Sequence, residues 1–203
     1  MKYKSEEIVE IIGKKIVNGE FQELDTIPKM EILADTYQVS RTVIREALKV
    51  LSRMGMVESV KKSGTVVLHR SEWHWWDQQI LQWVIDSINE NNHVNFILHL
   101  TEMRLPLEPT AIYLATKRAT EEDLEEIKRC ILKLEQSIDN LDQWAIADYK
   151  FHLSLVKASH NYLMINTLTK LNKALVYSRK KTYGKLNNQI KSNEIDYDSY
   201  KKH

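Results

Sequence analysis

Apolar residues recur at helical spacing along most of the chain. Four isoleucines between positions 8 and 16 share one helical face, and Gly19 follows them, where glycine can adopt the left-handed conformation that ends helices. This pattern predicts a first helix over about 5–18. Two further stripes predict a short helix from Pro28 to about Tyr37, and a third over about 41–54 that Ser40 can cap.

The pattern changes to short β-prone runs between Val57 and Leu68. These runs flank a turn that contains Gly64, which predicts a small hairpin. Beyond residue 93 the spacing is helical again. It predicts helices over about 94–117, 121–139, 142–159 and 162–183, the second opened by a capping box that begins at Thr120.

These elements predict a mainly α protein in three parts. Residues 1–70 form a winged helix-turn-helix, made of three helices plus a small β-hairpin, and residues 93–203 form an all-α antiparallel helical bundle. Between them, residues 71–92 hold four of the five tryptophans and are expected to be a linker helix. One face of that helix is expected to pack on both domains: Trp76, Ile80, Trp83, Val84 and Ile88.

Composition excludes several classes of protein. The 203 residues suit one large or two small domains, and no apolar run approaches the roughly 20 residues that a membrane helix needs. The N-terminus turns acidic after two lysines, unlike a signal peptide, and the lone Cys130 is expected to be a buried thiol. We therefore expect a cytoplasmic protein.

The net charge of +1 hides an uneven distribution. Residues 1–70 carry +2, residues 71–142 carry −8 and residues 143–203 carry +7. Within the first part, residues 41–70 hold seven basic and two acidic side chains, an excess that suits an anionic polymer such as nucleic acid.

The helix expected over 41–54 has an apolar face and a basic face. The apolar face consists of Ile44, Ala47, Leu48 and Leu51. The other face carries Arg41, Thr42, Arg45 and Lys49. Arginine can bind the O6 and N7 atoms of guanine, lysine neutralises phosphate, and the neighbouring Val43 can contact a thymine methyl group.

The tip of the hairpin adds a second candidate DNA contact. Lys61 and Lys62 supply charge, and Gly64 permits close approach of the backbone, as a wing on DNA requires. A solvated turn is the alternative interpretation. The position of this turn behind a capped basic helix favours the DNA contact.

The stretch IPKMEILADTYQVSRTVIREALKVLSRMGMVESVKKSGTVV, residues 27–67, resembles the GntR family of bacterial transcription regulators without a gap. The resemblance implies that Ser40 and the basic helix face bind operator DNA. Where the family usually has a basic contact residue early in the second helix, this chain has Glu31, and Lys29 can replace that contact only in part.

The helical part resembles the ligand-binding FCD domain of the FadR-like branch, through LTEMRLPLEPTAIYLATKRATEEDLEEI and ADYKFHLSLVKASHN. Asp148 and His152 are spaced so that a carboxylate and an imidazole can meet at one metal ion, although a surface hydrogen bond is the commoner role for such a pair. The resemblance implies that the pair supplies two ligands of a divalent metal. The metal could be Zn, Ni, Mn or Mg.

The resemblance also implies two further histidine ligands downstream. His203 stands at about the distance of the third, and the chain stops before the fourth, so we expect an incomplete C-terminal end and a weaker site. Arg104 matches a position from which the family reaches the effector carboxylate, although it can instead pair with Glu108. Asn161 either lines the pocket or marks a helix end, and the remaining histidines have no partners at ligand spacing.

Together these patterns and resemblances predict a DNA-binding transcription regulator that responds to a small carboxylate. It is expected to be a homodimer and to act as a repressor. The Trp-rich linker resembles the sub-branch that responds to sugar acids, although core packing also explains it. One alternative is a regulator with a metal-free helical interaction domain. A metal-dependent enzyme is the other, but no separate general base stands at a suitable spacing, so we expect no enzyme activity.

Overall fold

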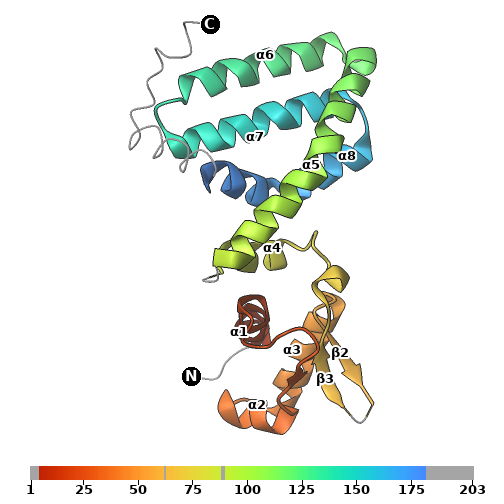
Figure 1. The fold of residues 1–203 in the computed structure, drawn as a ribbon, viewed down its shortest axis with the longest axis vertical. Coiled ribbons are helices and arrows are strands. Elements are labelled where there is room, and N and C mark those ends of the chain that lie inside the picture. Colours follow the sequence, from red (N-terminus) through yellow and green to blue (C-terminus); the bar gives the residue numbers. More distant parts are fainter. Residues whose placement is uncertain (1–4, 62, 88–89, 182–203) are drawn as a thin grey trace, which may run out of the picture. The chain divides into compact units, whose positions relative to one another are not determined.

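The computed structural model describes residues 5–61, 63–87 and 90–181 (Figure 1). The chain divides into two compact units, Met1–Leu98 and His99–His203, and the division falls within one long helix. The fold is mainly α, as predicted, with one small sheet among the described residues. No helix in this part of the chain is long and apolar enough to cross a bilayer.

The N-terminal unit contains the predicted winged helix-turn-helix. Its helices are α1 (Ser5–Asn18), α2 (Met30–Thr36) and α3 (Arg41–Arg53). The predicted hairpin consists of β2 (Val57–Val60) and β3 (Gly64–Val67), which pair antiparallel. A further strand, β1 (Thr26–Ile27), pairs with β3 and was not predicted, because two residues are too few to show an alternating pattern.

Local signals in the sequence set the ends of these helices. Gly19 has φ of +81° after α1, in the left-handed region that glycine tolerates best. The Ser40 hydroxyl accepts a hydrogen bond from the Val43 backbone N–H, 3.3 Å away, and so caps α3. The buried core of this unit then joins α1, α3 and the sheet through Ile12, Leu51 and Val67.

The tryptophan-rich segment differs from the prediction. The single helix expected over 71–92 is replaced by a 3-10 turn (Arg70–Glu72), an irregular stretch and the short helix α4 (Gln78–Ile85). Trp73 has extended backbone, and its indole N–H donates to the Leu68 carbonyl oxygen instead of lying along a helix. Asp77 caps α4 with its carboxylate, so that the helix begins only after Trp76.

The expected packing face is accordingly shorter than predicted. Ile80, Trp83 and Val84 are buried in the core of the N-terminal unit, whereas Trp76 precedes α4 and is 46% exposed. Ile88 lies outside the described residues.

The second unit is the predicted antiparallel helical bundle. The long helix α5 (Glu90–Arg118) runs into it, followed by α6 (Glu121–Gln136), α7 (Leu141–Ala158) and α8 (Tyr162–Lys170). Figure 1 shows α6 and α7 side by side, and Thr120 forms the predicted capping box at the start of α6. The helix expected over 162–183 is interrupted at Leu171, and residues 172–181 form a separate helical segment.

Candidate functional site

Helix α3 has the two faces that its sequence predicts. The buried residues of this helix are Ile44, Ala47, Leu48 and Leu51. The exposed residues include Arg41, Thr42, Arg45 and Lys49, and Val43 is half-buried beside them. Packing of one face against the unit's core therefore holds the basic face toward solvent.

Two glutamates neutralise part of this basic face. Glu31 on α2 lies 3.3 Å from the Arg41 guanidinium, and both side chains are about half exposed or more, at 48% and 71%. Glu46 lies 3.0 Å from the Lys49 ammonium and 3.7 Å from Arg45, and the Lys49 contact lowers the pKa of the Glu46 carboxyl. Acidic groups therefore lie beside the predicted DNA contacts of α3.

The wing and the start of α2 supply the other predicted DNA contacts. Lys61 and Gly64 are exposed at the end of the hairpin, and Gly64 has φ of +93°, which a residue with a side chain rarely adopts. Lys29 is exposed at the N-cap of α2, two positions before Glu31 in the sequence. Lys62 lies outside the described residues.

A network of five charged groups lies inside the helical unit. The Arg104 Nε donates to Glu108 Oε1 at 2.6 Å along α5, so the structure contains the ion pair that was the alternative role for Arg104. Glu108 Oε2 lies 3.1 Å from His152 Nδ1, and His152 Nε2 lies 3.6 Å from Asp148 Oδ1. Asp148 Oδ2 in turn accepts a hydrogen bond from the Arg179 guanidinium.

Burial makes these interactions strong. Burial alone would raise the pKa of the Glu108 carboxyl, but hydrogen bonds from His152 and Arg104 lower it to about 2. Contacts with Asp148 and Glu108 raise the pKa of His152 to about 9. Burial likewise opposes ionisation of Asp148, yet His152 and Arg179 hold its pKa below the ordinary value. At neutral pH, the two carboxylates therefore face three cations.

Arg179 is the member of this network that the sequence analysis missed. It lies in the helical segment 172–181, and its side chain is only 6% exposed. A signal was present: Arg179 extends an apolar stripe formed by Leu171, Ala174 and Leu175, all of which are buried. A basic residue at a core-facing position needs a buried acidic partner.

The remaining predicted residues of the helical unit have more local roles. Asn161 caps α8, because its side-chain oxygen accepts hydrogen bonds from the backbone N–H groups of Leu163 and Met164. This corresponds to the helix-end interpretation. His160 pairs with Asp123 at 2.8 Å, outside the charged network. His203 lies outside the described residues.

The described donor groups do not fit a metal ion. Over residues 5–61, 63–87 and 90–181, no cluster of three His, Cys, Asp or Glu side chains could hold one. Asp148 and His152 do lie together, as predicted from their spacing. However, Asp148 is hydrogen-bonded to Arg179, and both ring nitrogens of His152 face carboxylates.

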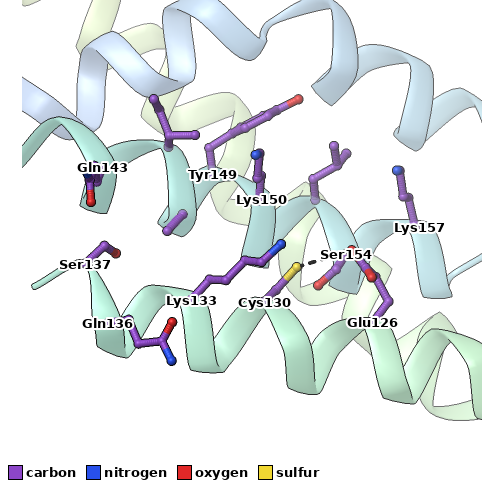
Figure 2. Close-up of a pocket in the computed structure, with 13 residues that line it drawn as sticks. Glu126, Cys130, Lys133, Gln136, Ser137, Gln143, Tyr149, Lys150, Ser154 and Lys157 are labelled. Carbon is purple, nitrogen blue, oxygen red and sulfur yellow. Dashed lines mark hydrogen bonds between the residues drawn. The ribbon is translucent and has the colours of Figure 1, made fainter.

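A separate groove of about 620 Å³ lies between α6 and α7 (Figure 2). Lys133, Lys150 and Lys157 line it together with Cys130, whose thiol lies 3.6 Å from a Glu126 carboxylate oxygen. Cys130 is 5% exposed, as expected for a buried thiol, and burial raises its pKa. None of the five charged groups of the network lines this groove, so the two are distinct candidate sites.

Comparisons with protein families match both units. Residues 4–67 match the family described as "Bacterial regulatory proteins, gntR family", and residues 99–194 match the FCD domain. The first match covers α1 to β3 and includes the basic face of α3. The second covers the helices that carry the charged network.

Curated relatives are transcription regulators. The chain is 28% identical over 158 residues to the galactonate operon transcriptional repressor of Escherichia coli, an alignment that covers 78% of this chain and 68% of that protein. It is 30% identical over 167 residues to the HTH-type transcriptional regulator LutR of Bacillus subtilis, covering 82% of this chain and 73% of LutR. For another relative, the "Putative L-lactate dehydrogenase operon regulatory protein" of Escherichia coli, the alignment covers only 60% of that protein's length.

One solved structure covers nearly the whole chain. Its title is "Lar controls the expression of the Listeria monocytogenes agr system and mediates virulence", and it aligns with a TM-score of 0.50 and 18% identity. The alignment covers 97% of this chain and 89% of that one. At this identity the likeness concerns the fold alone.

Proposed function

Because the chain belongs to the GntR family of bacterial transcription regulators and has an FCD domain, we propose that a small carboxylate ligand controls its binding to DNA. The main support for DNA binding is the exposed basic face of α3. The opposite, apolar face of this helix packs in the core of the unit and so keeps the basic face exposed. The proposed contacts are Lys29, Ser40, Arg41, Thr42, Val43, Arg45, Lys49, Lys61, Lys62 and Gly64.

We propose that the regulator binds its operator as a homodimer. A two-fold dimer places two copies of α3 on two half-sites, so the operator would be a pseudo-palindrome. A ligand that changes the relative placement of the two helices would then change DNA affinity. By thermodynamic linkage, operator DNA would change the affinity for that ligand by the same factor.

The proposed effector is a sugar acid or a related hydroxy acid. Arg104 and Arg179 supply guanidinium groups inside the FCD domain, and guanidinium pairs strongly with carboxylate when both are shielded from water. The name of the galactonate operon repressor connects that relative with a sugar acid, which makes sodium galactonate the first compound to try. A thermal-shift series tests it, because a ligand of the folded state raises the melting temperature.

Replacing Arg45 with alanine is expected to weaken specific DNA binding by about 1–3 kcal/mol, or roughly 5- to 150-fold, if this side chain reads a guanine. The operator is first selected from a random duplex pool with the wild-type chain, and both proteins are then titrated against it at one salt concentration. Lys14→Ala is the control, because Lys14 is paired with Glu10 on α1. Equal affinity of Arg45→Ala and wild type would remove Arg45 from the readout.

Replacing Glu31 with glutamine is expected to strengthen DNA binding by up to about five-fold. The change frees Arg41 from an exposed ion pair, an interaction worth about 0.2–1 kcal/mol, and removes a negative charge beside the proposed phosphate path. The same titration measures it. Glu10→Gln, which frees Lys14 on α1, should leave the affinity unchanged; weaker binding by Glu31→Gln would show that Glu31 supports the DNA-bound state.

A further inference from the structure

The buried arginine of the charged network is hydrogen-bonded to the carboxylate of the predicted metal-binding pair. Arg179 donates through Nε to Asp148 Oδ2, and its NH1 group lies 3.4 Å from the Leu175 carbonyl oxygen of the preceding turn. Its side chain is 6% exposed and that of Asp148 is 15% exposed. The guanidinium is therefore buried inside the helical unit and is not a surface group.

A divalent ion at the Asp148–His152 pair needs a free carboxylate oxygen and an imidazole nitrogen with an available lone pair. Here the two oxygens of Asp148 face Arg179 and His152, and the two ring nitrogens of His152 face Asp148 and Glu108. An ion could enter only by displacing Arg179. It would then leave a buried guanidinium without its partner, which is strongly unfavourable.

We propose that Arg179 takes the place of the metal ion in this FCD domain, so that the domain binds its anionic ligand without a metal. The identity of the ligand rests on the proposed function. The replacement of the metal ion by Arg179 rests only on the contacts of Asp148 and does not depend on which ligand binds.

The same arrangement indicates what the site attracts. Both guanidinium groups of the network are largely buried, with Arg104 18% exposed and Arg179 6% exposed. Guanidinium groups that are shielded from water favour oxyanions, which can accept several hydrogen bonds from them. Carboxylates and phosphates share that chemistry, whereas a free cation does not.

Metal content tests the proposal on the full chain. Wild type, Arg179→Ala and Lys180→Ala are dialysed with Zn²⁺, Ni²⁺ or Mn²⁺ and then with metal-free buffer, and bound metal is measured by mass spectrometry. Wild type and Lys180→Ala should hold no stoichiometric metal. Arg179→Ala, in which Asp148 is freed, should bind Zn²⁺ at least about ten-fold more tightly than wild type, the size of effect that neighbouring groups have on metal sites.

Lys180 is the matched control because it is adjacent in sequence, basic and paired with an aspartate, Asp142, at the surface. Arg179→Met keeps more of the side-chain volume and provides a second variant if Arg179→Ala does not fold. One bound metal per wild-type chain would overturn the proposal, and so would an Arg179 variant that is folded yet gains no metal affinity. The proposal would also be overturned if wild type holds metal and the Asp148→Ala variant does not.

Sodium galactonate, added with and without a chelator, separates this inference from the proposed function. A melting-temperature rise that survives chelation supports metal-free binding, and a rise that chelation abolishes contradicts it. If galactonate has no effect, the proposed effector is wrong, while the metal measurement still decides the role of Arg179.

Discussion

Replacing Asp148 with alanine should lower the free energy of unfolding of the helical unit by about 3–5 kcal/mol, the cost of removing one partner of a buried ion pair. The variant leaves the Arg179 guanidinium buried without its carboxylate, and it also removes a contact of His152. Urea unfolding followed by circular dichroism measures the change. The slope of the transition should stay the same if only stability is affected.

Asp142→Ala provides the comparison on the same helix. Asp142 is paired with Lys180 at 2.7 Å, but its side chain is 73% exposed, so its loss should change stability by less than about 1 kcal/mol. Adding Arg179→Met to Asp148→Ala should restore part of the lost stability, because the unpaired charge is then gone. A loss below about 1 kcal/mol for Asp148→Ala alone would mean that water reaches the guanidinium.

Stability should reach its maximum between about pH 4.5 and 6.5 and fall on both sides. The pKa of Glu108 is about 2 in the folded chain against an ordinary 4.5, so its contribution is fully present above pH 4.5 and is lost as the pH falls toward 2. The pKa of His152 is about 9 against an ordinary 6.5. Its contribution is fully present below pH 6.5 and is lost as the pH rises toward 9.

Each pKa unit corresponds to about 1.4 kcal/mol, so each side of this profile should span about 3 kcal/mol. The two effects share the contact between His152 and Glu108 and are therefore not independent. Urea unfolding at pH steps from 2 to 9 measures the profile, and His152→Gln should flatten its alkaline side. A wild-type profile that is level between pH 6.5 and 9 would contradict the charged state assigned to His152.

The features predicted most accurately from the sequence are those that depend on neighbouring residues. Ser40 and Thr120 cap α3 and α6 as expected, because a capping side chain acts on amides two or three positions away. The apolar stripe of α3 likewise appears within a few turns of sequence. These signals were sufficient to predict the winged helix-turn-helix and the bundle.

Two predictions failed because side chains make contacts that helical spacing does not show. The tryptophan segment has the apolar spacing of a helix, but the indole groups of Trp73 and Trp75 donate to backbone carbonyls of residues 68 and 70, which an uninterrupted helix would not allow. Asp148 and Arg179 are 31 residues apart, so no local pattern shows that they pair. Spacing within α7 alone suggested a metal pair instead.

The Cys130 thiol in the groove between α6 and α7 can report on the separation of these two helices, through its rate of chemical modification. Only the thiolate reacts quickly with disulfide or alkylating reagents, and Cys130 is both covered and held in the protonated form. We therefore expect labelling to be slow while α6 and α7 stay packed and faster when they separate. The rate of modification at this single cysteine would measure local opening of the helical bundle, a motion that a static structure does not record.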